Sequence, residues 1–255
     1  MGRPRVDYEQ QGRTYGQQRR SEPRIAARID AALGDARTVL NVGAGTGSYE
    51  PTDRWVLAVE PSATMRAQRP VGAAPAIAAR AEALPFDDGA FDAAMACLTI
   101  HHWEPPDAGL AEMRRVARGP VVVLTFDLDS LPAWQQQHLA PGLDIERPRF
   151  PSVDHVASVL GGRTRVERIP TPGDCADGFF EAFWRRPEAL LDPRVRAAQS
   201  MWALLPPGVE QGIVDGLAAS LESGAWDAEH GHLRDQDEYA GSLRLVVSEA
   251  HVPRR

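Results

Sequence analysis

Three glycines at alternate positions, Gly43, Gly45 and Gly47, follow the apolar segment 38–42, and here residue types and spacing first indicate chemistry. Glycine lacks a Cβ, so the backbone can turn tightly and approach a ligand closely. In open α/β sheets such a turn lies in the crevice at the carboxyl ends of the strands, where ligands bind. Ser48 stands where the dinucleotide fingerprint G-x-G-x-x-G has its third glycine. The spacing therefore counts against a nicotinamide cofactor.

A carboxylate, Glu60, ends the next apolar segment, residues 55–59. An acid in this place of a nucleotide-binding fold accepts hydrogen bonds from ribose hydroxyls. The glycine turn and this acid together predict an adenosine-type ligand.

His101, His102 and Asp127 are the candidate catalytic residues. They follow the apolar segments 91–100 and 121–126, which are typical of buried parallel strands whose carboxyl ends face the ligand crevice. Because neighbouring side chains of a strand point in opposite directions, one histidine is expected to enter the crevice. It would act as a general base, since imidazole titrates near neutral pH, and Asp127 would orient the acceptor or its proton. The alternative is that one histidine holds the following loop and neither touches substrate.

The elements that must position these residues follow from hydrophobic periodicity and turn signals. Apolar residues at spacing four predict a helix over 24–33, and Asp107 is expected to cap a helix that runs to residue 118. Short apolar runs predict strands, the last of them antiparallel at or beside the sheet edge. The predicted strands are residues 38–42, 55–60, 76–79, 91–100, 121–126, 163–170 and 242–247.

Residues Val39 to Gly47, Glu60 and the later run Ala81 to Phe86 together resemble class I S-adenosylmethionine-dependent methyltransferases of the small-molecule, type 11 kind. The resemblance covers roughly the first half of the chain. It implies a doubly wound, Rossmann-like α/β fold with a seven-stranded sheet of order 3-2-1-4-5-7-6. It also implies S-adenosyl-L-methionine as cofactor and S-adenosyl-L-homocysteine as product.

The resemblance further implies which residues hold the cofactor. Tyr15 and Arg20 would cap its methionine end, with the arginine paired to the carboxylate, although a solvated basic tail is the alternative. The implied cofactor residues are Tyr15, Arg20, Asn41, Gly43, Ala44, Gly45, Gly47, Glu60, Pro61, Ala81, Glu82 and Leu98.

Two positions depart from the family pattern. Asn41 stands where the family commonly has an acid, so the charge that helps hold an ammonium group is missing. Arg80 stands where an acid often takes the adenine amino group, and arginine has no acceptor. Glu82 or the backbone at Ala81 would have to recognise adenine instead.

We divide the chain into a cofactor-capping segment and helix (1–36), the cofactor-binding core (37–170), a helical insertion (171–240) and a final strand and tail (241–255). The insertion is far longer than most connections in compact domains. Its aromatic residues, including Phe183 and Trp184, predict a lid over the cofactor mouth. An ordinary helical subdomain or a dimer contact is the competing interpretation.

Composition limits the partners. The chain has 255 residues, 43% of them hydrophobic, and a formal net charge of -7, which suits one globular domain without a broad basic surface for nucleic acid. We expect a small-molecule acceptor, no metal and no membrane association, because no apolar run is long enough to span a bilayer. The only cysteines, Cys97 and Cys175, favour reduced thiols and a cytoplasmic location. Either a monomer or a homodimer fits.

The predicted reaction is methyl transfer to an oxygen, nitrogen or carbon nucleophile of a small molecule, with a natural-product-type acceptor as one candidate. A protein of the same fold that binds the cofactor without methyl transfer, such as a cyclase or regulator, is the alternative. A nicotinamide-dependent oxidoreductase fits the glycine spacing less well.

Overall fold

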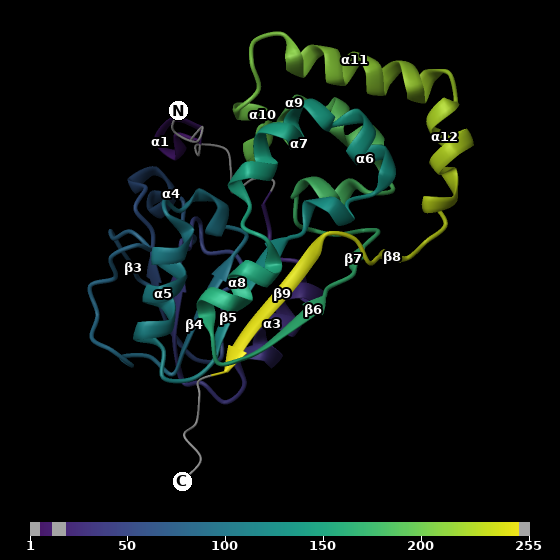
Figure 1. Ribbon diagram of the computed structural model, residues 1–255. Coiled ribbons are helices and arrows are strands. Elements are labelled where there is room, and N and C mark those ends of the chain that lie inside the picture. Colours follow the sequence, from purple (N-terminus) through teal and green to yellow (C-terminus); the bar gives the residue numbers. More distant parts are fainter. Residues whose placement is uncertain (1–5, 12–18, 250–255) are drawn as a thin grey trace.

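The computed structural model describes residues 6–11 and 19–249, so Tyr15 lies outside the described residues. Figure 1 shows the helices and strands, which we give first for the amino-terminal half of the chain and then for the carboxyl-terminal half. The first elements along the chain are α1 (Tyr8–Gln11), α3 (Pro23–Leu33), β1 (Thr38–Val42), β2 (Trp55–Val59), α4 (Ala63–Ala67), β3 (Ala76–Ile77), β4 (Ala93–Cys97), η2 (Ile100–His102), α5 (Pro106–Val116) and β5 (Val121–Phe126). They continue with η3 (Leu128–Ser130), α6 (Ala133–His138), α7 (Ala140–Glu146), η4 (Arg147–Arg149), α8 (Val153–Leu160), β6 (Arg163–Arg168), β7 (Thr171–Pro172), η5 (Phe180–Phe183), η6 (Pro187–Leu191), α9 (Pro193–Arg196), α10 (Ser200–Ala203), α11 (Val209–Glu222), α12 (Ala225–His230), η7 (Gly231–Leu233), β8 (Glu238–Tyr239) and β9 (Leu243–Glu249).

The main sheet has seven strands in the order β3-β2-β1-β4-β5-β9-β6. Strands β1 to β5 pair in parallel, whereas β9 lies between β5 and β6 and is antiparallel to both. This confirms the predicted fold and strand order, with β9 as the seventh strand of the sheet. The third strand is shorter than expected, because β3 ends at Ile77 rather than at residue 79.

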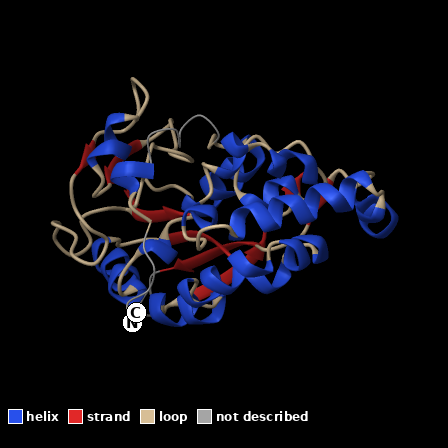
Figure 2. Cartoon of the chain, turned by 90° about the horizontal axis from the view of Figure 1, so that it is seen from above, coloured by secondary structure: helices blue, strands red, loops and turns tan. Residues whose placement is uncertain are grey.

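Helices cover both faces of the sheet (Figures 1 and 2). The apolar face of α3 packs with Val122 and Leu124 of β5, and those of α5 and α8 pack with Val121 and Val123 of the same strand. Alternate residues of a strand point to opposite faces, so a strand buried on both sides is largely apolar, and in β5 every residue except Thr125 is apolar. The sheet is thereby a rigid platform whose carboxyl edge carries the site.

Two helices begin in different ways. Ser62 caps α4, with its hydroxyl accepting from the Met65 amide at 3.1 Å. The prediction for Asp107 is wrong. Helix α5 begins at Pro106, whose fixed φ and missing N–H suit the first helical position. The Asp107 carboxylate instead lies 2.8 Å from Nε2 of His155 on α8.

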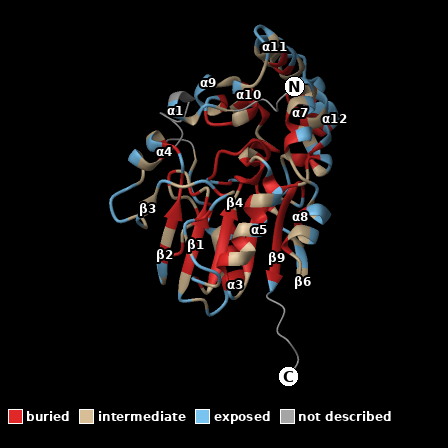
Figure 3. Cartoon of the chain, turned by 60° about the vertical axis from the view of Figure 1, so that its left-hand side comes forward, coloured by how far each residue is buried: buried red, intermediate tan, exposed pale blue. Residues whose placement is uncertain are grey.

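Two insertions lie beyond the carboxyl ends of β1, β2 and β4 (Figure 3). One runs from η3 to η4, and the other from η5 to η7, where the short antiparallel pair β7–β8 closes its base. Helices α9 and α10 are separate because Gln199 is extended between them, and its side-chain amide donates to the buried Gly178 carbonyl. Residues Phe180–Phe183 form a 3₁₀ turn, η5.

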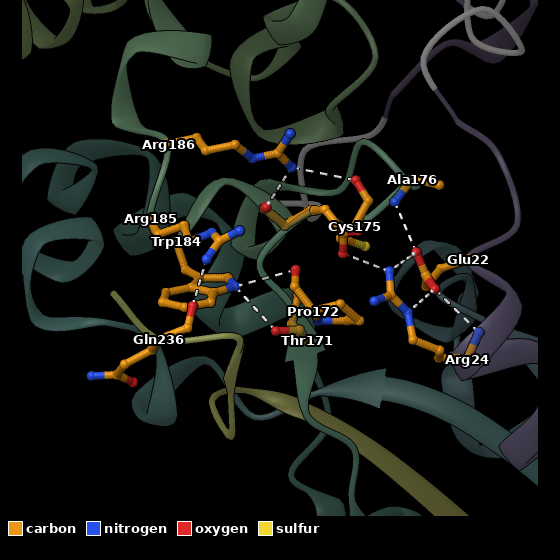
Figure 4. A network of polar contacts seen from close by, with 12 residues as sticks. Glu22, Arg24, Thr171, Pro172, Cys175, Ala176, Trp184, Arg185, Arg186 and Gln236 are labelled. Carbon is orange, nitrogen blue, oxygen red and sulfur yellow. Dashed lines mark hydrogen bonds and ion pairs between the residues drawn. The ribbon is translucent and has the colours of Figure 1, made fainter. Parts of the chain in front are cut away.

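The insertions have an apolar core of their own. Trp134, Trp184 and Trp226 are fully buried, and Trp184 Nε1 donates to the Thr171 carbonyl at 3.1 Å (Figure 4). Figure 4 also shows Glu22 at the start of α3 accepting from the Ala176 amide, at 2.9 Å. These contacts fit the interpretation of a helical subdomain. In the described ranges, no helix combines the length and the apolar character needed to cross a membrane.

Candidate functional site

A cleft with a cavity volume of about 350 Å³ opens at the carboxyl ends of β1, β2 and β4. It brings together most of the residues predicted for the cofactor and two of the three predicted for catalysis. The predicted residues that line it are Asn41, Gly43, Ala44, Gly45, Glu60, Pro61, Ala81, Glu82, Leu98, His101 and His102.

The glycine turn forms one wall of the cleft. Gly43 and Gly45 have φ values of 69° and 52°, a left-handed region that residues with a Cβ rarely adopt. A Cβ added at Gly43 would lie only 2.4 Å from Oγ1 of Thr99. The amides of Gly43 and Ala44 both donate to the Val59 carbonyl, which fixes the turn against β2. Gly47 also has a positive φ but is not among the residues that line the cleft.

Glu60 stands beside this turn at the end of β2. Its Oε2 accepts from the Gly45 amide at 2.9 Å, and its Oε1 accepts from the Ser62 amide at 2.8 Å. Burial raises the pKa of Glu60, although these hydrogen bonds favour the charged form. Each carboxylate oxygen has a second lone pair, so both can accept a ribose hydroxyl. The buried acid and the turn that a Cβ would fill fit an adenosine-type cofactor.

The structure explains Asn41. Its Nδ2 donates to Oε1 of Glu50 at 3.1 Å, and both Glu50 oxygens accept from Arg69 at 2.7 Å. Arg69 also donates to the Gly45 carbonyl at 3.3 Å, so this buried network supports the glycine turn from behind. An acid at position 41 would set a second carboxylate against Glu50. Glu50 and Arg69 belong to no sequence motif, so only the structure reveals their place behind the turn.

Glu82 and Arg80 form the end of the cleft next to Ala81. Oε1 of Glu82 accepts from the Glu104 amide at 2.6 Å and from Arg80 at 3.2 Å. Arg80 therefore forms an ion pair with Glu82, the acid that we expected to recognise adenine because Arg80 cannot. A role for Glu82 or for the Ala81 backbone in adenine recognition stays a prediction.

The residues before α3 are arranged differently from the prediction. Arg20 is exposed and does not line the cleft, whereas its neighbour Arg19 does. Arg19 binds the Asp177 carboxylate with Nε at 2.5 Å and Nη2 at 3.3 Å. The Tyr49 hydroxyl donates to the same carboxylate at 2.8 Å. Of these two neighbouring arginines, the one that lines the cleft is therefore Arg19, held by an acid 158 residues away.

Both histidines line the cleft, in η2. His102 Nε2 lies 2.9 Å from the Tyr8 hydroxyl, and His102 Nδ1 lies 3.0 Å from Nη2 of Arg149. The His101 ring stacks on Phe150 with centroids 4.1 Å apart. Burial, and then neighbouring positive groups, lower both pKa values, that of His102 to about 3. Both rings are therefore neutral at physiological pH, and the prediction of a base that titrates near neutrality has no support in these shifts.

Asp127 lies away from the histidines. Its Oδ2 accepts from Nη2 of Arg244 at 2.9 Å and from the Ser130 hydroxyl at 2.8 Å. It does not line the cleft, although it follows β5 as expected. The structure thus gives Asp127 a contact with β9, and it corrects the expectation that all three candidate catalytic residues lie together.

A second, smaller hollow of about 30 Å³ adjoins the cleft. Leu98, His101 and His102 line both spaces. The wall of the hollow is aromatic and comes partly from the insertions. Its phenylalanines are Phe126, Phe150, Phe179 and Phe180. Phe183 and Trp184, which the sequence analysis placed in a lid, do not line it.

The described residues hold no group of three or more His, Cys, Asp and Glu side chains arranged to bind a metal ion. Cys97 and Cys175 are free thiols, and burial raises the pKa of both, that of Cys175 to about 12.

Comparison with known proteins identifies the family. Residues 40–123 match the methyltransferase domain family. The chain is also similar to a solved structure from Anabaena variabilis, described as a candidate methyltransferase from an antibiotic biosynthesis pathway. The two are 30% identical with a TM-score of 0.84, over 91% of this chain and 99% of that one. The chain belongs to the class I S-adenosylmethionine-dependent methyltransferases.

Two further similarities are narrower. A demethylmenaquinone methyltransferase of Mycolicibacterium gilvum is 36% identical over 109 residues, which are 40% of this chain. The match spans 48% of that relative, about half of its length. A phosphoethanolamine N-methyltransferase of Haemonchus contortus, solved with S-adenosylmethionine, shares the fold alone, at 14% identity and a TM-score of 0.52 over 91% of this chain and 54% of that one. S-adenosylmethionine is the cofactor of this methyltransferase fold.

Proposed function

We propose that this methyltransferase transfers a methyl group to an oxygen, nitrogen or carbon nucleophile of a small molecule that binds in the cleft, beside the wall that the cleft shares with the aromatic hollow. The observation that carries the proposal is this shared wall. Leu98, His101 and His102 line both the hollow and the cleft that contains the glycine turn and Glu60. A donor held by the turn and Glu60 and an acceptor held against the shared wall would meet at these residues.

The residues of the cleft suit the two ends of the cofactor. Glu60 would accept the ribose hydroxyls, and Ala81 and Glu82 lie where adenine contacts are expected. Arg19 replaces Arg20 in our proposal as the partner of the methionine carboxylate, because a guanidinium binds a carboxylate through charge-assisted hydrogen bonds. Gly43 and Gly45 would let the backbone of the turn approach the cofactor closely, and Asn41 would support the turn from behind through Glu50.

The cofactor supplies an electrophilic methyl group on a sulfonium, so the protein has mainly to align the acceptor with it and to exclude water. Alignment of two bound reactants can lower a barrier by about 7–11 kcal/mol. The neutral histidines and the Phe walls would hold the acceptor, and no proton transfer to a residue with a pKa near 7 is required.

The four phenylalanines favour a flat, apolar acceptor, because aromatic rings pack well against planar ligands. The relative named as a demethylmenaquinone methyltransferase and the one described as belonging to antibiotic biosynthesis support an aromatic or natural-product-type acceptor for this chain as well. A cytoplasmic location, and the choice between monomer and homodimer, stay predictions.

Calorimetry with S-adenosylhomocysteine and with NADH tests the cofactor site. We expect binding of the former only, and Glu60→Ala should weaken it by about 1–3 kcal/mol, the scale for hydrogen bonds to a charged group. An unchanged dissociation constant in a folded Glu60→Ala protein would remove Glu60 from the site.

A methyl-transfer screen over phenols, enols, amines and carboxylic acids then tests the reaction. Product from at least one aromatic acceptor is the expected outcome. Tight cofactor binding without transfer to any acceptor would favour the cyclase or regulator alternative.

A further inference from the structure

A chain of four hydrogen bonds follows the wall of the cleft from the insertions to α1. The Ser200 hydroxyl donates to Oε1 of Glu146 at 3.1 Å, and Nη1 of Arg149 donates to Oε2 at 2.6 Å. Nη2 of Arg149 then reaches His102 Nδ1 at 3.0 Å, and His102 Nε2 reaches the Tyr8 hydroxyl at 2.9 Å. These residues come from α10, α7, η4, η2 and α1, so five separate elements meet in one line.

The central ion pair is buried, with 3% of each side chain exposed. Taking two charges out of water costs several kcal/mol per ion, so a buried pair is weak evidence for a stabilising role. Burial raises the pKa of Glu146, while Arg149 and Ser200 favour its charged form. Because the Arg149 guanidinium is buried beside His102 Nδ1, we infer that its hydrogen bond to this nitrogen serves to orient the ring.

Donor and acceptor chemistry fixes the protonation of His102. A guanidinium has only donors, so Nδ1 must accept from Arg149. A neutral imidazole carries its single proton on the other nitrogen, which is Nε2. Nε2–H therefore donates to the Tyr8 oxygen, and the Tyr8 proton is directed to a different partner. Tyr8 lines both the cleft and the hollow. An acceptor bound beside the wall that these two spaces share would therefore lie next to the residue at the end of this chain of donors.

We propose that Arg149 is a positioning residue that fixes His102 as its Nε2–H tautomer, so that Tyr8 donates a hydrogen bond to a phenol- or enol-type acceptor that binds as its oxyanion. This inference rests on the proposed function for the identity of the ligand as a methyl acceptor. The tautomer itself depends only on the residues of this chain.

The surroundings of His102 favour the anion over a base. Arg149 and Arg19 are the positive groups that act on the ring, His101 is its neutral neighbour at a centroid distance of 3.9 Å, and Glu146 lies behind Arg149. A second proton on Nδ1 would face the guanidinium directly. For an oxygen nucleophile, the hydroxyl proton leaves to solvent on binding. The oxyanion then forms the bond to the methyl carbon while the carbon–sulfur bond breaks and sulfur keeps its electron pair.

Nitrogen NMR of the full-length protein, labelled on its histidine rings, tests the tautomer without any acceptor. We expect His102, assigned through His102→Gln, to show a protonated Nε2 and a bare Nδ1 at every pH between about 5.5 and 8.5, since its pKa lies well below this range. The double variant Arg149→Met with Glu146→Gln removes both buried charges together and should release a mixture of tautomers. Ser200→Ala, which leaves Arg149 in place, is the matched control and should not. A proton on Nδ1 in the unmodified protein, or an unchanged tautomer in the double variant, overturns the assignment.

A nitrophenol, whose ionisation is visible in its absorbance, tests the oxyanion in the presence of S-adenosylhomocysteine. We expect the protein to bind the phenolate about tenfold more tightly than the phenol, which lowers the apparent pKa of the bound ligand by about one unit. Tyr8→Phe and the double variant should lose this preference. An unshifted ionisation, or no binding of the nitrophenol, overturns the oxyanion inference even if methyl transfer is established. A lowered ligand pKa without methyl transfer to any acceptor would instead retain it and contradict the proposed function.

Discussion

At the scale of single residues, the cleft shows how one position along the chain changes a functional assignment. Arg19 and Arg20 are adjacent, yet only Arg19 turns into the cleft, where Asp177 and Tyr49 form a network with it. Its side chain is 10% exposed, while Asp177 is fully buried. A guanidinium in this setting is less hydrated than a surface arginine and binds a carboxylate more strongly.

We expect Arg19→Gln to weaken S-adenosylhomocysteine binding by about tenfold or more, the scale of one charge-assisted hydrogen bond. Arg20→Gln is the control of identical chemistry and should change the dissociation constant less than about twofold, because exposed charges contribute little. Calorimetry measures both, and circular dichroism checks that the unpaired Asp177 leaves the first variant folded. Equal losses in the two variants would contradict our placement of the methionine carboxylate.

At the scale of elements, the starts of β1 and β4 are tied together at the edge of the sheet opposite to the site. The Asp92 carboxylate accepts from the amides of Arg37 and Thr38 at 2.9 Å, and Arg118 donates to it from the end of α5. These hydrogen bonds, that of the Thr38 amide first, lower the pKa of Asp92 to about 2. The tie fixes the register at the start of the strand that leads into the glycine turn.

A carboxyl with a depressed pKa contributes stability that is complete above its unfolded value of 3.8 and is lost as the pH falls through its folded value of about 2. Asp92→Asn should therefore lower the free energy of unfolding by about 1–3 kcal/mol at pH 7. The difference from the unmodified protein should shrink between about pH 4 and pH 2. Urea unfolding across this range measures it, and a gap that persists unchanged at pH 2 would mean that the carboxylate charge is not responsible.

At the scale of the whole molecule, the insertions combine two functions that the sequence does not separate. Trp184 is fully buried and lies in their apolar core, whereas Phe180 lies in the wall of the hollow. Glu22, at the start of α3, accepts a hydrogen bond from the Ala176 amide and so connects this helix of the core to the segment that follows β7. Aromatic residues of one short segment thus have different roles: Trp184 packs in the core of the subdomain, and Phe180 faces the site.

Trp184→Ala should destabilise the protein by about 3–5 kcal/mol, the usual cost of removing a buried aromatic side chain. Phe180→Leu, a smaller change in volume, should cost less than about 1.5 kcal/mol. Phe180→Leu should nevertheless raise the Michaelis constant of an aromatic acceptor, or weaken nitrophenol binding before the acceptor is known. A stable Trp184→Ala protein that has lost transfer would instead return Trp184 to the lid that the sequence suggested.

The sequence by itself determined the sheet and the cofactor end of the site. Strand β1, the glycine turn and Glu60 lie within 23 residues of one another, and local rules govern them: apolar runs make buried strands, and glycine permits the turn. The strand order was predicted through the family resemblance, and the pairing of β9 between β5 and β6 confirms it.

Only the tertiary structure decided the partners of the polar side chains. Tyr8 meets His102 across 94 residues, Arg19 meets Asp177 across 158, and Arg244 reaches Asp127 across 117. No periodicity or spacing encodes such pairs, because they depend on where insertions cross the sheet edge. Burial, with Arg149 and Arg19, lowers the pKa of His102 below the range that the sequence predicted. A pKa depends on the burial and charges around a group, and these are set by the tertiary structure.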